Sequence, residues 1–292
     1  MEIRALLGIL AGVIFAMLLA LAGCSQAMGS DQADLTNMQS VQPNPAWLEL
    51  AQRVHAKHNG QKNYVALIGD SITFTDAFWT PLEFTSPEDY LKNDGLPLTP
   101  DGKKWKDTLL GLRGKGMEHC NGSGWQVGHI LRMIDQLMQR EKPSIAIIMV
   151  GTNDVGSGKC PPGYDEQLER IVLKCLDYKC IPILNTIPPR HGKDEAVLEA
   201  NKHIRALAKR KKLPLVDYYA EMTRRQPMEK MYETLMSKDG IHPSGGKYTD
   251  YSDDNLSKSG YALRNWMNFL MVREIYFRVL HPQEMEKLTK KE

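Results

Sequence analysis

The chain has 292 residues, of which 42% are hydrophobic and 25% charged, a composition ordinary for a globular enzyme. Its 37 Lys and Arg nearly balance its 35 Asp and Glu, and the formal charge of +2 excludes the broad basic field that recruits nucleic acid. We expect one domain of roughly 200 to 250 residues with tails.

The first 23 residues have the pattern of a signal peptide. Arg4 precedes an apolar run over residues 5–22, and the run stops at Gly23-Cys24. This ending resembles the lipobox of bacterial lipoproteins, which implies that Cys24 is lipidated and becomes the mature N-terminus. The alternative is an uncleaved membrane anchor, since about 20 apolar residues span a bilayer. Both predict a protein tethered in the bacterial cell envelope, facing the periplasm or the exterior.

Residues 24–44 are polar and lack an apolar period, which predicts a flexible linker before a domain at 45–292. In that domain, short apolar runs alternate with longer amphipathic ones. The expected strands are 64–68, a weak one near 116–120, 144–150, 181–187 and 213–216. The expected helices are 126–140, 164–178, 194–211, 219–236 and 259–280. Uniformly apolar strands alternating with helices predict a three-layer α/β/α sandwich around a doubly wound parallel sheet of about five strands.

One stretch, residues 75–115, does not follow this alternation. It contains several aromatic residues among prolines, acids and glycines, and it directly follows the first strand's polar loop. Long irregular insertions at such an edge are commonly lids or binding loops. The alternative is that the insertion packs beside the core.

Four cysteines remain after Cys24, and in an oxidising compartment they permit two disulfides with three possible pairings. We expect Cys175 to pair with Cys180 and Cys120 with Cys160. No CxxC pair and no His-x-x-x-His helix accompanies them, so we expect no metal site.

Chemistry in a doubly wound sheet gathers where the strands end. After the first strand comes Gly69-Asp70-Ser71, in which Ser71 is either a nucleophile or a helix N-cap. After the second comes Cys120-Asn121-Gly122-Ser123-Gly124, whose glycines allow close approach of backbone N–H groups to a ligand. After the third comes Gly151-Thr152-Asn153-Asp154, where the Asn153 amide is suited to an oxyanion, or else forms a simple Asx turn.

A carboxylate and an imidazole share one loop near the C-terminus, in Asp239-Gly240-Ile241-His242-Pro243. Asp239 is placed to accept Nδ1–H of His242, which leaves Nε2 free to take a proton from a serine. Together these four segments resemble the four blocks of the SGNH, or GDSL-type, hydrolases, over residues 63–269. No Gly-x-Ser-x-Gly elbow surrounds Ser71, so the α/β-hydrolase fold is not supported.

The resemblance implies a serine esterase that needs no cofactor. Ser71 would be the nucleophile, His242 the base and then acid, and Asp239 its orienting partner. The oxyanion hole would comprise the backbone N–H groups of Ser71 and Gly124 and the Asn153 side chain. Gly122 is the alternative to Gly124, which we prefer because it leads directly into the helix.

Three further residues are candidate substrate-binding groups: Asp70 beside the nucleophile, and Arg190 and His191 after the fourth strand. For the last two the alternative is a rigid surface turn. We expect short acyl esters, such as O-acetyl groups on a small molecule or glycan, as substrates. The alternatives are lysophospholipase or thioesterase action on longer chains, acyl transfer to an alcohol, and a non-catalytic glycan-binding lipoprotein.

Overall fold

A parallel five-stranded sheet forms the centre of the fold in the computed structural model, which describes residues 44–289 apart from 93, 109 and 112–113. The strand order across the sheet is β2-β1-β3-β4-β5. The bounds are β1 Tyr64–Gly69, β2 Leu110–Gly111, β3 Ile145–Met149, β4 Ile181–Asn185 and β5 Leu215–Val216. Every residue of β1, β3 and β4 is buried. The predicted doubly wound parallel sheet is confirmed.

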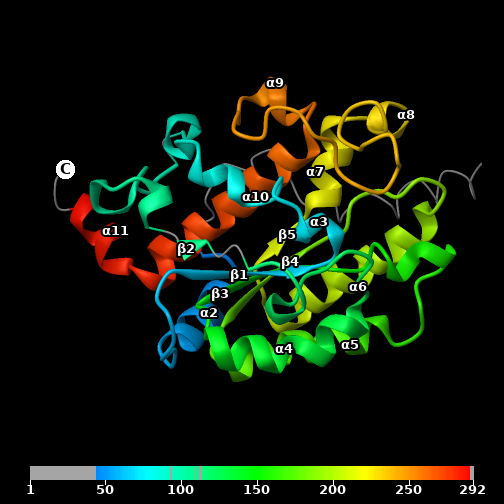
Figure 1. The fold of residues 1–292 in the computed structure, drawn as a ribbon. Coiled ribbons are helices and arrows are strands. Elements are labelled where there is room, and N and C mark those ends of the chain that lie inside the picture. The colour runs from blue at the N-terminus through cyan, green and yellow to red at the C-terminus, as the bar shows by residue number, and fades with distance from the viewer. Residues whose placement is uncertain (1–43, 93, 109, 112–113, 290–292) are drawn as a thin grey trace, which may run out of the picture. The chain divides into compact units, whose positions relative to one another are not determined.

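Helices cover both faces of this sheet, with α4, α5 and α6 together on one face and α10 on the other (Figure 1). The steps from β2 to β3, β4 and β5 run in one direction, so right-handed crossovers place their three helices on the same side. The helix bounds are α2 Leu48–His55, α3 Ser71–Phe74, α4 Val127–Glu141, α5 Tyr164–Asp177, α6 Asp194–Lys211, α7 Tyr218–Arg225, α8 Met228–Met231, α9 Asp253–Leu256, α10 Gly260–Ile275 and α11 Pro282–Thr289.

The prediction of a weak strand near 116–120 is wrong. Met117–His119 forms a 3-10 turn, and the edge strand of the sheet is β2. An isolated parallel bridge joins Gly69 to Asn121 here, and the buried side chain of Asn121 adds further hydrogen bonds. Its amide donates to the carbonyls of Leu67 and Gly114 at 2.9 and 2.8 Å, and its Oδ1 accepts from Gly116 N at 3.0 Å. A side-chain hydrogen-bond network therefore shapes this loop beside β1.

Two predicted helices are shorter than expected. The segment 219–236 divides into α7 and α8 because Pro227 cannot donate a backbone hydrogen bond and forces Gln226 into an extended conformation. The last expected helix ends at Ile275, where the π-helical turn η7, Tyr276–Leu280, continues the chain.

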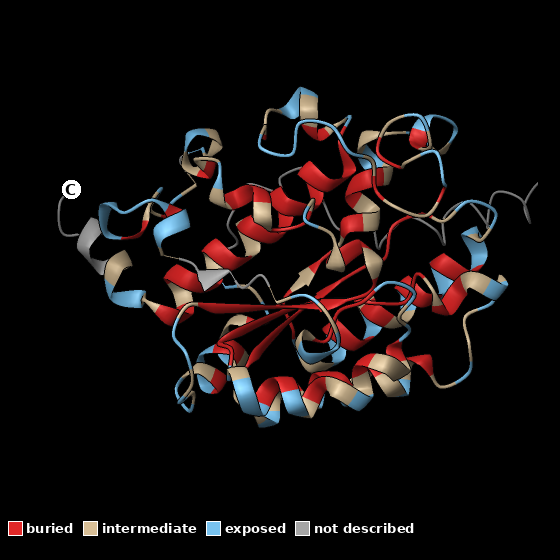
Figure 2. Ribbon diagram, viewed as in Figure 1, coloured by how far each residue is buried: buried red, intermediate tan, exposed pale blue. Residues whose placement is uncertain are grey.

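Helix α10 is buried around almost its whole circumference (Figure 2). The sheet covers one side, and the insertion 75–115 covers another. Arg273 of α10 forms a buried bidentate ion pair with Asp94, at 2.7 and 2.9 Å, and Trp105 packs edge-on against Phe269 at 5.3 Å. The described part of the insertion is thus anchored to α10, and its chief aromatic side chains, Phe78, Trp79 and Trp105, are buried in this packing.

The expected disulfides are not formed, because all four cysteines of the described residues are free thiols. Cys120 is fully buried, and burial raises the pKa of its thiol to about 12. Cys160 lies elsewhere, in the loop before α5 and near Glu199 of α6. A buried, protonated thiol such as that of Cys120 is chemically inert.

The predicted signal peptide, the lipidated Cys24 and nearly all of the predicted linker fall outside the described residues. Within the described part of the chain, none of the helices combines the length and the apolar character that a membrane crossing requires.

Candidate active site

Ser71 is the first residue of α3, a helix of a single turn that begins where β1 ends. Asp70 caps this helix, since its Oδ1 accepts a hydrogen bond from Ile72 N at 3.0 Å. The Ser71 side chain is half-buried, and its backbone N–H is directed out of the first turn of a helix, where orphan donors favour negative charge. Ser71 therefore places both its side-chain hydroxyl and its backbone N–H at the edge of the sheet.

His242 lies beside Ser71, with Ser71 Oγ and His242 Nε2 separated by 2.8 Å. On the other side of the ring, Nδ1 lies 2.6 Å from Asp239 Oδ2. A carboxylate accepts only, so Nδ1 carries the proton and Nε2 is left free to accept the hydrogen bond that the Ser71 hydroxyl donates. This is the geometry of a nucleophile, a base and an orienting acid.

The Asp239 carboxylate is held by more than the imidazole. Its Oδ1 accepts from Ser237 Oγ at 2.5 Å and from the backbone N–H groups of Ile241 and His242 at 2.8 and 3.0 Å. Partial burial alone would raise the pKa of Asp239, but these hydrogen bonds and that of the His242 side chain outweigh it and hold the pKa well below its ordinary value. Asp239 is therefore ionised across the physiological pH range.

The Asn153 amide and the loop before α4 stand together at the ends of β3 and β1. Asn153 Nδ2 donates to the Trp125 carbonyl at 3.0 Å, which uses one N–H and fixes the direction of the other. The N–H of Gly122 donates to Gly69 O at 3.3 Å, whereas none of the described hydrogen bonds uses the N–H of Gly124. Gly124 has φ +74°, a conformation in which its N–H is free to face a ligand. This difference favours Gly124 over Gly122.

Asp154 ties the Asn153 turn to the loop before α4. It is 6% exposed, and both of its carboxylate oxygens lie 3.2 Å from Val127 N, at the start of α4. Burial raises the pKa of Asp154 to about 6, although the hydrogen bond from Val127 opposes the shift. The residue next to Asn153 thus anchors the helix that follows Gly124.

The structure corrects the expected role of Asp70 in substrate binding. Its side chain is completely buried, and burial raises its pKa to about 6 against the opposing hydrogen bond from Ile72. A residue without solvent contact cannot touch substrate, so Asp70 acts through α3, which it caps.

Arg190 and His191 lie against the catalytic loops. The Arg190 guanidinium donates to the Thr152 carbonyl, in the same turn as Asn153. The backbone N–H of His191 donates to Gly240 O at 2.8 Å, and its exposed ring packs edge-on against Tyr232 at 5.1 Å. Both residues therefore brace the loops that carry Asn153 and His242.

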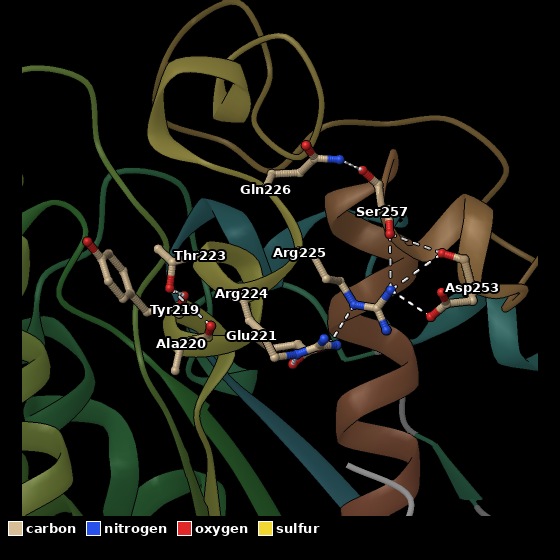
Figure 3. A network of polar contacts seen from close by, with 9 residues as sticks. All are labelled: Tyr219, Ala220, Glu221, Thr223, Arg224, Arg225, Gln226, Asp253 and Ser257. Atoms are coloured by element: carbon tan, nitrogen blue, oxygen red, sulfur yellow. Dashed lines mark hydrogen bonds and ion pairs between the residues drawn. The ribbon is translucent and has the colours of Figure 1, made fainter. Parts of the chain in front are cut away.

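Segment 245–258, for which the sequence indicates no role, follows the His242 loop and is held to α7. The network in Figure 3 links it to α7: Arg225 bridges Glu221 at 2.6 Å and Asp253 at 2.9 Å, and Gln226 donates to Ser257 O at 2.7 Å. Glu221 is only 2% exposed and is paired to two arginines, so its charge is compensated.

Sequence reasoning missed three residues that organise the site: Asn121 in the oxyanion loop, Asp154 beneath it and Ser237 beside the catalytic carboxylate. The only signal for Asn121 and Asp154 is that each is polar and stands in a predicted strand-end loop. Among the described residues, no group of three or more His, Cys, Asp and Glu side chains is placed to hold a metal ion.

The comparisons with known proteins point to one family. Residues 67–248, more than half of the chain, match the model of the GDSL-like lipase/acylhydrolase family. A lipolytic protein of the G-D-S-L family from Desulfitobacterium hafniense DCB-2 has 21% sequence identity and a TM-score of 0.50, covering 72% of this chain and 99% of its own. LAE5, an alpha/beta hydrolase enzyme from the metagenome of Lake Arreo, Spain, has 17% identity and a TM-score of 0.53, covering 74% and 97%. These likenesses show a shared fold. None of the curated proteins matches this sequence.

Proposed function

The chain belongs to the GDSL-like lipase/acylhydrolase family and is a serine ester hydrolase, and from this we propose that Ser71, His242 and Asp239 form its catalytic triad. The observation that carries the proposal is the continuous chain of hydrogen bonds from Ser71 Oγ through His242 to Asp239, at 2.8 and 2.6 Å. Ser71 begins α3, whereas Asp239 and His242 share a loop in which His242 lies 171 positions further along the chain, so the arrangement joins two segments that are distant in sequence.

In the proposed reaction, Ser71 Oγ attacks the ester carbonyl while His242 Nε2 takes the hydroxyl proton. The carbonyl oxygen becomes an oxyanion, which the N–H groups of Ser71 and Gly124 and the Asn153 amide stabilise. His242 then gives its proton to the leaving alcohol, and an acyl ester remains on Ser71. Water, deprotonated by His242, attacks this ester and releases the carboxylic acid and the free hydroxyl of Ser71.

We propose short acyl esters, including O-acetyl groups on carbohydrates, as the substrates. An ester carried on a large hydrated molecule needs an open site, and Ser123, Gly124 and Gln126 beside the oxyanion hole are all exposed. In the insertion, Phe78, Trp79 and Trp105 are buried and offer no surface for stacking on a sugar, and Phe84 is exposed; the half-exposed Trp125 stands next to Gly124. Trp125 therefore supports a carbohydrate as the carrier of the ester.

The proposal also includes membrane tethering through a lipid on Cys24, which rests on the lipobox-like sequence alone. Metabolic labelling with a fatty-acid analogue tests it, since the Cys24→Ala variant should lose the label.

A parallel assay of acetylated sugars and a series of nitrophenyl esters tests the substrate. A short-chain esterase should lose activity steeply beyond a few carbons, and activity that rises with chain length would instead indicate a lysophospholipase or thioesterase. Adding an alcohol acceptor and analysing products distinguishes hydrolysis from acyl transfer.

A further inference from the structure

A fully buried arginine of α10 reaches the nucleophile helix. Arg264 is 0% exposed, and its guanidinium donates from Nη1 to Ile72 O at 2.6 Å and from Nη2 to Thr73 Oγ1 at 2.9 Å. The guanidinium also lies 3.5 Å from the centre of the Phe78 ring, within cation–π range. Burial lowers the pKa of Arg264 to about 10, so the group remains a cation at neutral pH.

Helix α3 depends on contacts of this kind because it has only four residues. Thr73 N and Phe74 N donate to Asp70 O at the start of this helix, and a single turn is not stable by itself. Ile72 O is an orphan carbonyl of this turn, and Arg264 is its partner among the described hydrogen bonds. Asp70 holds the start of the turn and Arg264 holds its end, with Ser71 between them.

The next residue of α10, Asn265, holds the segment that follows. Its amide Nδ2 donates to Ala77 O at 2.9 Å, and its Oδ1 accepts from Trp79 N at 2.8 Å. Trp79 has φ +67° and ψ −43°, inside a tight turn closed by Thr80 N and Phe78 O at 2.8 Å. A bulky residue in this conformation is strained, and such strain persists only where neighbouring contacts enforce it.

We propose that Arg264 and Asn265 form a clamp that positions the Ser71 nucleophile, so that they serve catalysis without touching substrate. The clamp lies beyond residues 67–248, the part of the chain that matches the family model. It joins α10 to both ends of the stretch 72–79, which leads directly away from Ser71. This inference rests on Ser71 as the nucleophile.

The clamp should affect turnover more than substrate binding. Two of the proposed oxyanion donors, the Gly124 N–H and the Asn153 amide, and the base His242 lie outside α3, so the substrate still docks when α3 shifts. The Ser71 hydroxyl and N–H, which move with α3, then no longer meet the carbonyl in the productive geometry. A displacement of about 1 Å can cost on the order of 10²-fold in rate.

The test compares two charge-conserving variants of α10, Arg264→Lys and Arg273→Lys. Both replace a buried, multiply bonded guanidinium on the same helix, but Arg273 holds Asp94, Leu96 and Pro97 of the insertion instead of α3. For a nitrophenyl acetate, Arg264→Lys should lower kcat about 10- to 100-fold with KM changed less than about 2-fold. It should slow fluorophosphonate labelling of Ser71, mapped by mass spectrometry, by a similar factor. Arg273→Lys should keep kcat within about 2-fold of wild type while lowering the thermal midpoint.

Wild-type kcat in Arg264→Lys, or an equal kcat loss in both variants, would overturn the clamp. If Arg264→Lys does not accumulate, Thr73→Val removes only the acceptor of Nη2, and it should lower kcat several-fold at unchanged KM; unchanged kcat there also overturns the proposal. Retained activity in Ser71→Ala, or labelling at another residue, would instead refute the proposed nucleophile, so the two failures are distinguishable.

Discussion

Ser71 Oγ and His242 Nε2 lie 2.8 Å apart although 171 positions separate the two residues along the chain. The contact joins the end of the first buried strand to a loop that follows the last one. In the proposed mechanism, this contact lets His242 take the hydroxyl proton of Ser71 as the ester is attacked.

Replacing the nucleophile should abolish the reaction. Ser71→Ala removes Oγ, so covalent labelling by a fluorophosphonate and ester hydrolysis should both disappear, while circular dichroism remains that of the wild type. Ser157→Ala is the matched control, since this exposed serine bonds only a neighbouring carbonyl in its own loop. Hydrolysis by folded Ser71→Ala would refute the mechanism.

Removing the side-chain donor of the oxyanion hole should slow the reaction without abolishing it. Asn153→Ala leaves two backbone donors, so kcat should fall about 10²- to 10³-fold, or roughly 3 to 4 kcal/mol, with a small change in KM. Fluorophosphonate labelling should persist at a reduced rate. A loss that appears only in KM would place Asn153 in substrate binding instead.

Substitutions of Asp239 and of Ser237, which donates to its carboxylate, should lower kcat by different amounts. Asp239→Asn favours the wrong imidazole tautomer and should lower kcat about 10³- to 10⁴-fold. Ser237→Ala removes one of several hydrogen bonds to the same carboxylate, so kcat should fall less than about 10-fold. Kinetics of both variants at neutral pH, set beside the wild type, check the ranking, which equal losses would contradict.

The buried Asp154 should make stability depend on pH in a defined direction. Its folded pKa is about 6 and its ordinary value is 3.8, so between these values the folded state binds more protons than the unfolded state. Stability therefore falls as pH rises through this window. Relative to non-titrating Asp154→Asn, the wild type should lose on the order of 2 to 3 kcal/mol between about pH 3 and pH 7. Urea unfolding of both proteins across this range measures the difference, and a constant difference would contradict the shift.

Gly240 should tolerate no side chain. It has φ +68°, and a Cβ there would lie 2.6 Å from His191 Cβ, so Gly240→Ala must displace the loop between Asp239 and His242. We expect kcat to fall at least about 10-fold. In addition, the backbone strain should lower the free energy of unfolding by roughly 1 kcal/mol. Gly192→Ala separates the two effects, because Gly192 has φ +67° with open space around it and should change stability more than kcat.

Sequence predicted the sheet because long apolar runs such as β3 carry an unambiguous signal, and α6 begins and ends at the predicted residues. The four polar loops were found because strand ends of a parallel sheet meet at one edge. The structure brings Ser71, Asp239 and His242 together there, as the resemblance implies. The choice between Gly122 and Gly124 needed the hydrogen bond from Gly122 N to Gly69 O, which depends on how the loop folds back on β1.

Other features had no local signal. The edge strand has two residues, too few to show a period, and a glycine-flanked turn near Met117 resembled a strand more closely. Buried polar residues such as Asp70 are indistinguishable in sequence from exposed ones, because their burial depends on helices that arrive much later in the chain. Arg264 and Asn265 could not be recognised as clamp residues, because their partners lie 186 to 192 positions earlier in the chain.

The clamp also bears on when the enzyme becomes competent during synthesis. A growing chain that has passed Pro243 already contains every residue of the triad and the oxyanion hole, yet α10 is still missing. The one-turn helix that carries Ser71 then lacks the partner of its free carbonyl, and the strained Trp79 turn has nothing to enforce it. Competence should therefore arise late and abruptly, once residues 260–275 have been made and have folded against the sheet.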